Sequence, residues 1–436
     1  MSGVPAPHPR VDTPPVFRIN LSLPPVERYV ELAQLYRDRL RAVRGLFDEL
    51  VISIFPKILL GLIHWLLWLF LCTLYTTDET EEVRGISAVT GIDLYLLVFF
   101  NTVVDLLMGC TSGGARVRNF NGSIQMLHFR TLDWAMDPLR DLIVQLEFYR
   151  DTEPDKTLAT SVTYVGFVGV LTAVRKDLSV SINFRPVHDK KHNFAFYFNH
   201  LLVLLGRGQS ISSRLRDCIL PSSENIPPPT LGDIVDNVPK MSTTAAYLIF
   251  CDGSTTVIME KDFKTAVVRS SASFIVVTNH DYEPDAASPG TTAEKKSGNH
   301  IVLSLKHSLT ELHEESTERW ECMQGKWNHE VREMQRILQL KRNSAGEHLK
   351  HEEQREAEGS RTSLRQRRKR EQRAKSEGIT AAYPVDETAL AITRREVVTW
   401  LTTYPIVNES THYAIVMDPI RGKPIWVRRY NAMESK

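Results

Sequence analysis

The first quarter of the chain has the hydrophobic pattern of helices. Apolar residues recur at helical spacing from Val26 to about Leu50, directly after Pro24-Pro25. Residues 85–107 are apolar, and their few polar residues lie at helical intervals, which predicts one or two buried helices leading to residue 109. Val16 to Leu21 alternates like a strand. Residues 16–109 are therefore expected to form a mainly helical region.

One stretch of this region, Ile58 to Tyr75, has 18 residues and no formal charge. Such a length is the minimum for a helix that crosses a bilayer. Pro56 and Lys57 interrupt its N-terminal side, and His64 lies within it. We therefore expect a buried helix or one that lies on a bilayer surface, with a true membrane span as the alternative.

After residue 133 the pattern changes to short runs rich in β-branched and aromatic residues, which are typical of strands. Two helical segments interrupt them, the first ending at Gly206 and Gly208. The order of strands, helices and strands predicts an α+β fold with a stacked antiparallel sheet. The expected strands are 142–148, 161–165, 169–174, 178–184, 245–250, 255–260, 264–269, 274–278, 413–417 and 424–429, and the expected helices are 193–205 and 210–220.

A highly charged segment extends from Lys326 to about Gly378. Within it, Arg361 to Lys375 contains eight Arg or Lys residues against one acidic residue. Such a composition forms no packed core. The run is consistent with a nuclear-localisation signal or a nucleic-acid patch, but it has no interleaved aromatic residues. We favour a solvated helical insertion over residues 326–380 and expect no nucleic-acid partner.

The composition of the whole chain is that of a globular protein. Its 436 residues are 42% hydrophobic and 24% charged, with a formal net charge of +1, so no global field favours nucleic acid or a membrane. The five cysteines are scattered and include no C-x-x-C pair, so neither a disulfide framework nor a zinc site is expected. Residues 1–15 are rich in proline and are expected to be disordered, with no evident secretory signal.

Candidate chemistry gathers between Met108 and Trp134. Cys110 follows an apolar run, and the alternating segment from Ser123 to Phe129 is expected to be a strand that delivers Arg130 to Asp133 on a turn. A thiol, a guanidinium group and a carboxylate are thereby expected to meet.

These residues resemble the acid ceramidase and N-acylethanolamine acid amidase family, which are cysteine N-terminal-nucleophile hydrolases. The family pattern is Cys-Thr-Ser, a strand and Arg-Asn-x-Asp. This chain has Cys110-Thr111-Ser112 and Arg130-Thr131-Leu132-Asp133. Further matches follow in family order over most of the chain, at residues 163–172, 181–183, 278–281 and 402–426, but not in the first dozen residues or in 326–381.

The resemblance implies a four-layer αββα sandwich that is cut between Gly109 and Cys110. The helical N-terminal part would be the small subunit and would stay associated with the large one. The catalytic domain would comprise residues 110–325 and, after the charged insertion, 381–436. A location in a lysosome or vacuole is implied by the resemblance alone, and the compartment stays open.

The resemblance also implies catalytic roles that require neither a cofactor nor a metal. Cys110 would be the nucleophile, and its freed α-amine, with a reference pKa of roughly 7.7 to 8.0, would be the base. Arg130 would favour the thiolate, Asp133 would bind the new ammonium group, and Asn279 would donate to the oxyanion. Arg319 is the candidate for the family's final arginine. Without the family context, Cys110 is typical of an inert core thiol, Asn279 of a turn residue and Arg319 of an exposed arginine.

Two departures from the family pattern bear on the substrate. Asn183-Phe184-Arg185 stands where the family has Asn-Glu-Arg, so an aromatic ring replaces a carboxylate among the candidate substrate-binding residues. Gly113-Gly114 replaces the usual branched residues. The sequence therefore supports an amidase for lipid amides, with ceramide placed ahead of N-acylethanolamine as the substrate. The protein is expected to contact a membrane surface through residues 58–75. The alternative is a lipid-binding protein with weakened catalysis.

Overall fold

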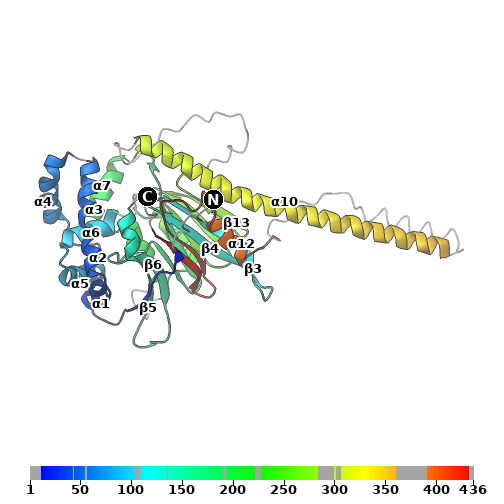
Figure 1. Ribbon diagram of the computed structural model, residues 1–436, viewed down its shortest axis with the longest axis horizontal. Helices are drawn as coiled ribbons and strands as arrows, with labels where there is room; N and C mark the ends of the chain where they lie inside the picture. The colour runs from blue at the N-terminus through cyan, green and yellow to red at the C-terminus, as the bar shows by residue number, and fades with distance from the viewer. Residues whose placement is uncertain are drawn as a thin grey trace, which may run out of the picture. The chain divides into compact units, whose positions relative to one another are not determined.

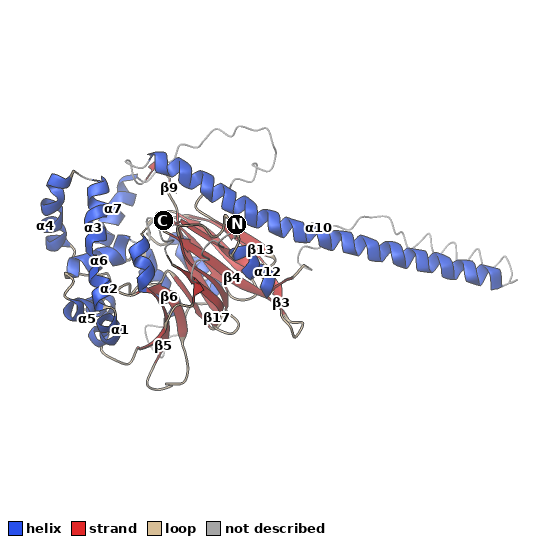
Figure 2. Ribbon diagram, viewed as in Figure 1, coloured by secondary structure: helices blue, strands red, loops and turns tan. Residues whose placement is uncertain are grey.

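The computed structural model describes residues 11–42, 44–54, 56–103, 109–134, 136–189, 193–220, 227–282, 299–300, 306–359 and 390–431. The chain divides into two compact units, Met1–Gln324 with Ile392–Lys436, and Gly325–Ala391. The first unit is a mixed α+β structure in which the N-terminal helices are followed by two sheets (Figures 1 and 2).

The N-terminal region contains several short helices where one long helix was expected. The 3-10 helix η1 (Pro25–Glu27) leads to α1 (Val30–Leu35), α2 (Arg37–Ala42) and α3 (Arg44–Ile54). The expected single helix from Val26 to Leu50 is wrong because Tyr36 leaves the helical conformation, at φ −99° and ψ 10°, and ends α1. α5 (Thr77–Thr90) and α6 (Leu94–Val103) follow. The Thr76 side chain caps the start of α5, and Gly91, at φ 72°, ends it.

The apolar stretch Ile58 to Tyr75 forms a shorter helix than its composition suggested. After η2 (Lys57–Leu59), α4 comprises only Leu60–Phe70, and Leu71 ends it at ψ 75°. Its 11 residues are about 16 Å long, against the roughly 30 Å of a bilayer core. Within the described residues, no helix is both long and apolar enough to cross a membrane.

The first sheet contains Cys110 and Arg130, on neighbouring strands. Its strand order is β1-β17-β16-β4-β3-β13, and β15 pairs with β3 in parallel. Residues 1–15 were expected to be disordered. This expectation is wrong for Val11 and Asp12, which form β1. Residues 1–10 lie outside the described part. The strands are β1 (Val11–Asp12), β17 (Lys423–Tyr430), β16 (Thr411–Asp418), β4 (Ile124–Asp133), β3 (Gly109–Arg118), β13 (Phe274–Val277) and β15 (Ile392–Thr393).

The second sheet has the order β12-β11-β10-β8-β7-β6-β5-β2 and is antiparallel except where β2 pairs with β5. The strand expected from residue 169 begins only at Thr172, because a buried loop precedes it. The strands are β12 (Ala266–Ser271), β11 (Thr256–Lys261), β10 (Ala246–Cys251), β8 (Leu178–Phe184), β7 (Thr172–Arg175), β6 (Ala159–Tyr164), β5 (Ile143–Tyr149) and β2 (Val16–Asn20). A separate pair consists of β9 (Val187–His188) and β14 (Asn299–His300).

The two sheets pack against each other, with β3 against β8 and β4 against β10. Strands β6, β8, β10 and β11 are buried at every position, so both of their faces are covered. α8 (Ile211–Ile219) lies against β7 and β8, α12 (Arg394–Leu401) lies against β3 and β4, and α7 (Asn193–Leu204) lies against α6. Cys110 and Arg130 therefore lie in the interior, between layers.

Helix α10 (Lys306–Gly359) begins in the first unit and continues through the described part of the second. From Gln335 to Ser344 its described side chains are exposed. The basic run Arg361–Lys375 lies outside the described residues.

Candidate active site

The pairing of β3 with β4 brings the candidate thiol and guanidinium group together. Cys110 lies opposite Leu132, and Ser112 lies opposite Arg130. The Arg130 Nη2 atom donates to Cys110 Sγ at 3.4 Å, and both side chains are fully buried. The other terminal nitrogen of Arg130 donates to the Leu171 carbonyl and to Thr172 Oγ1. Arg130 is therefore fixed on one side by the second sheet and on the other by the thiol.

The backbone nitrogen of Cys110 is held by Asn279, which follows β13. Asn279 Oδ1 accepts from Cys110 N at 2.9 Å and from Arg319 Nη2 at 3.0 Å, while Nδ2 donates to the Phe184 carbonyl at 2.8 Å. Two donors on one atom fix the orientation of the amide. The carbonyl end of Asn279 thus faces the nitrogen that cleavage between Gly109 and Cys110 would convert to an amine.

A buried ion pair joins Asp133 to Arg319. Arg319 Nη1 lies 2.8 Å from Asp133 Oδ2, and Thr411 donates to Asp133 Oδ1 at 2.7 Å. Arg319 is 2% exposed, so the expectation of an exposed arginine in the absence of family context is wrong. The register of β16 against β4 shifts between Thr411 and Tyr413, and this bulge lies directly beside the contact to Asp133.

Burial dominates the electrostatics of the site in the uncut chain. It raises the pKa of the Cys110 thiol above its ordinary value, and Arg130 opposes this rise by favouring the thiolate. Burial also raises the pKa of Asp133, against the lowering effect of Arg319 and of the Thr411 hydroxyl. Before cleavage, the thiol is therefore protonated at neutral pH.

Of the candidate substrate-binding residues, Asn183 and Phe184 lie on opposite faces of β8. Ser112 donates to Asn183 Oδ1 at 2.6 Å, and Ser181 hydrogen-bonds to His128 of β4, so these alternate side chains face the first sheet. Successive strand residues point to opposite faces, so Phe184, which is 5% exposed, faces away from that sheet. Its contact with a substrate stays a prediction.

Arg185, the third candidate, is engaged by two carboxylates. Its Nε and Nη2 atoms donate to the two oxygens of Asp281 at 2.7 and 2.6 Å, and Nη1 lies 3.2 Å from Asp262. Because Asp281 is two residues after Asn279, this pair ties the Asn279 segment to the end of β8.

The two glycines that follow Cys-Thr-Ser have a packing reason. A Cβ atom on Gly113 would lie 2.0 Å from the Ile275 carbonyl oxygen, and one on Gly114 would lie 1.9 Å from Thr256 Oγ1. Branched residues do not fit on β3 where the neighbouring strands approach this closely.

The structure therefore brings all five candidate catalytic residues together, although they come from four separate segments. Sequence reasoning missed Thr411, Thr172 and Ser316, whose Oγ accepts from Asn279 N at 2.7 Å. Thr172 and Thr411 lie within the matched stretches 163–172 and 402–426, but nothing in the sequence distinguishes their hydroxyls from those of other residues, because only contacts across the fold make them relevant. Among the described residues, no group of three or more His, Cys, Asp or Glu side chains is placed to hold a metal ion.

Comparisons with known proteins give several matches. The family model described as the beta subunit of N-acylethanolamine-hydrolyzing acid amidase matches residues 12–74, which precede Cys110. Acid ceramidase from Bos taurus is 30% identical over 189 residues, covering 39% of this chain and 45% of that protein. The N-acylethanolamine-hydrolyzing acid amidase of Caenorhabditis elegans is 29% identical over 180 residues, covering 39% of this chain and 47% of that protein.

The matched part thus spans less than half the length of these curated relatives. Among solved structures, the Caenorhabditis elegans N-acylethanolamine-hydrolyzing acid amidase ortholog aligns with a TM-score of 0.41 and 16% identity. That alignment covers 73% of this chain and 99% of the other.

Proposed function

Because this chain is a distant member of the acid ceramidase and N-acylethanolamine acid amidase family, we propose that it cleaves the amide bond of N-acylated lipids through Cys110, after cleaving itself between Gly109 and Cys110. We place ceramide ahead of N-acylethanolamine as the substrate. Relatives of both kinds match at 30% and 29% identity, so identity does not separate the two headgroups.

The observation that carries this proposal is the arrangement around Cys110, in which Arg130 Nη2 lies 3.4 Å from the sulfur and Asn279 Oδ1 lies 2.9 Å from the nitrogen. A positive charge beside the sulfur favours the thiolate, which is the nucleophile. A hydrogen-bond acceptor beside the nitrogen orients the new α-amine, which takes the thiol proton and later gives it to the leaving amine.

The remaining groups support this chemistry. Asn279 Nδ2 is our candidate donor to the oxyanion, and a substrate would compete for it with the Phe184 carbonyl. The Asp133–Arg319 pair fixes the carbonyl end of Asn279 through Arg319 Nη2. A carboxylate near the amine also stabilises its ammonium form. We further propose that the two packed sheets and their helices form the αββα sandwich of N-terminal-nucleophile hydrolases.

Self-cleavage explains how a buried thiol reaches a substrate. Cys110 is completely buried, and in the uncut chain its nitrogen belongs to a peptide bond within β3. Gly109 has no side chain to shield its carbonyl, so the thiol can attack it. Cutting would free the start of β3 and open a route to Cys110. The two fragments would stay associated because helices α5 and α6 are packed into the same core.

We also propose that the enzyme works at a membrane surface. α4 has no buried residue, and Trp65 and Trp68 are 55% and 62% exposed. Its His64 hydrogen-bonds to Asp48 and Tyr95, which fixes one side of the helix to the protein. Phe194 and Phe198 of α7 are also exposed. Helix α7 lies against α6, beside the N-terminal helices (Figure 1). Such a surface suits the interfacial region of a bilayer.

The test compares purified protein with its Cys110→Ala variant on labelled ceramide and labelled N-acylethanolamine. Cys251→Ala is the matched control, because Cys251 is also a completely buried thiol but belongs to β10. We expect hydrolysis, and a large fragment that begins at Cys110, in the original protein and in Cys251→Ala only.

Two outcomes would contradict the proposal. Full activity from an uncut chain would exclude the N-terminal-nucleophile mechanism, and equal turnover in Cys110→Ala would exclude the thiol. Lipid binding without turnover of either substrate would favour the alternative of a weakened, lipid-binding relative, for which Phe184 in place of the family carboxylate is the motivating observation.

A further inference from the structure

The connection between β6 and β7, residues 165–171, provides one of the groups that hold Arg130. Its apolar side chains are nearly or completely buried. At its end, the Leu171 carbonyl accepts a hydrogen bond from Arg130 Nη1, and the Ile182 amide donates to the same oxygen at 3.2 Å. Because Arg130 Nη2 contacts the Cys110 sulfur, a shift of this loop would move the charge that favours the thiolate.

Asn101 of α6 holds the other end of the loop. Its Nδ2 donates to the Gly166 carbonyl at 2.9 Å, and its Oδ1 accepts from the Val168 amide at 2.8 Å. The side chain thus pairs with the loop as a neighbouring strand would, and it is only 3% exposed. Gly166, at φ +93°, permits the turn that presents both groups to Asn101.

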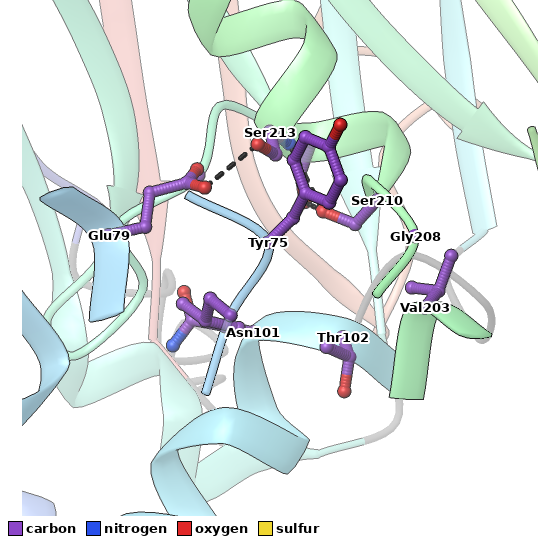
Figure 3. A pocket seen from close by; sticks show the side chains of 11 residues that line it. Tyr75, Glu79, Asn101, Thr102, Val203, Gly208, Ser210 and Ser213 are labelled. Atoms are coloured by element: carbon purple, nitrogen blue, oxygen red, sulfur yellow. Dashed lines mark hydrogen bonds between the residues drawn. The ribbon is translucent and has the colours of Figure 1, made fainter. Parts of the chain in front are cut away.

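The loop borders a small polar pocket beside Asn101. Asn101, Thr102, Glu79, Gly169 and Ser213 contribute to its lining, and Figure 3 shows the Glu79–Ser213 hydrogen bond across it. The accessible volume of about 10 Å³ corresponds to roughly one water molecule. At Gly169 itself the loop is closely packed, because a Cβ atom there would lie 2.8 Å from Ser212 Cβ.

A second tie comes from the same N-terminal part of the chain. Arg216 of α8 donates to the Val168 carbonyl at 2.8 Å and forms a two-point ion pair with Glu82 of α5, which is completely buried. Asn101 and Glu82 both precede the proposed cut at Gly109, whereas the loop, Arg216 and Arg130 follow it.

We propose that Asn101 is a positioning residue for Cys110, which acts by fixing the β6–β7 loop and, through the Leu171 carbonyl, the Arg130 guanidinium group. This inference rests on the proposed function, because it assigns to the small fragment a part in the thiol chemistry. The fragment released by cleavage would then be required for reactivity and not only for folding.

The first test removes the side-chain amide group of Asn101 and replaces it with an apolar side chain of similar size. Asn101→Leu leaves the Gly166 carbonyl and the Val168 amide without this partner. Thr102→Val is the matched control on the same helix, because the Thr102 hydroxyl donates only to the Val98 and Phe99 carbonyls of its own helix. The Cys110 thiolate is titrated by its ultraviolet absorbance, as the difference between each protein and the same protein carrying Cys110→Ser.

We expect Asn101→Leu to raise the apparent pKa of the Cys110 thiol by about one unit, because a guanidinium group in contact lowers a neighbouring acid's pKa by roughly one to three units. kcat for amide hydrolysis should fall about tenfold with little change in KM, because a positioning residue acts through the thiol and not through substrate binding. Thr102→Val should change neither. The titration needs no substrate, so it tests the positioning role even if the proposed amidase activity is absent.

The second variant keeps the experiment decisive if Asn101→Leu does not fold. In Asn101→Asp, a protonated carboxyl group can donate to the Gly166 carbonyl and accept from the Val168 amide, as Asn101 does. Above its own pKa, the carboxylate would repel the Gly166 carbonyl. We expect kcat near that of the original protein at low pH and a reversible loss as pH rises, together with a raised apparent pKa of the Cys110 thiol, with the folded state confirmed by circular dichroism.

Either of two results would overturn the inference. One is an unchanged Cys110 titration in folded Asn101→Leu. The other is an Asn101→Asp variant whose titration and kcat follow the original protein at every pH.

Discussion

The buried pair between Asp133 and Arg319 allows a quantitative test of the site. Arg319→Met would remove the contacts at 2.8 Å to Asp133 and 3.0 Å to Asn279, and would leave the Asp133 carboxylate buried with the Thr411 hydroxyl as its described donor. Removing one partner of a buried pair costs about 3–5 kcal/mol, because the other charge stays desolvated. The free energy of unfolding should fall by that amount near neutral pH.

The matched control lies on the same helix, α10. Arg336 is 72% exposed and lies 3.7 Å from Glu333, so Arg336→Met should change the free energy of unfolding by less than about 0.5 kcal/mol. Both variants are measured by urea denaturation followed by circular dichroism and tryptophan fluorescence.

The sign of the pH dependence adds a second constraint. Burial already raises the pKa of Asp133, and the loss of Arg319, which lowers it, would raise it further. A carboxyl group with a raised pKa in the folded state binds more protons there than in the unfolded chain, so stability falls as pH rises above the ordinary range of Asp. The deficit of Arg319→Met should therefore be larger at about pH 7.5 than at about pH 5.

Adding Asp133→Asn to Arg319→Met should recover part of the loss, since no buried charge remains. Equal stability of Arg319→Met and Arg336→Met would refute the buried pair. A deficit that does not shrink on acidification would refute the assignment of the cost to Asp133.

Three further predictions concern other parts of the chain. Phe184→Glu should lower the free energy of unfolding by about 3–5 kcal/mol because it buries a carboxyl group in place of a ring, whereas Phe184→Leu should cost about 1 kcal/mol, as measured by denaturation; a stable Glu variant with altered substrate preference would instead place this side chain in the pocket. Trp65→Glu with Trp68→Glu should weaken binding to lipid vesicles at least about tenfold in a flotation assay, because two exposed rings no longer enter the interface; Phe120→Glu, a fully exposed ring in the β3–β4 turn, should leave binding unchanged, and equal loss in both would argue against α4. Replacing Gln335–Gly378 by a glycine–serine linker should leave Tm nearly unchanged and the rate of hydrolysis within about twofold of the original, since the segment's described side chains are exposed and its composition forms no core. Loss of folding would show that the segment is structural.

Local patterns in the sequence predicted most of the strands and the resemblance to the family. Alternation and turn residues placed most strands to within a few residues. The motifs Cys110-Thr111-Ser112 and Arg130-Thr131-Leu132-Asp133 carried the resemblance to the family, and the catalytic roles of these residues stay predictions. These features are local, because a strand's period and a short motif are written in consecutive residues. The sequence overestimated helix length at residues 26–50 and 58–75, where apolar composition continues after the backbone leaves the helical conformation at Tyr36 and Leu71.

How the separated segments of the candidate site meet could be seen only in the folded chain. The tertiary structure turned the carbonyl of Asn279 toward the Cys110 nitrogen, buried Arg319 against Asp133 and added Thr411 and Ser316 to the site. It also gave Asn101 a link to the thiol through a loop more than sixty residues away in sequence. Such contacts depend on which strands pair and which faces pack. The free energy that favours one pairing over another comes from contacts throughout the core, so no local sequence pattern predicts it.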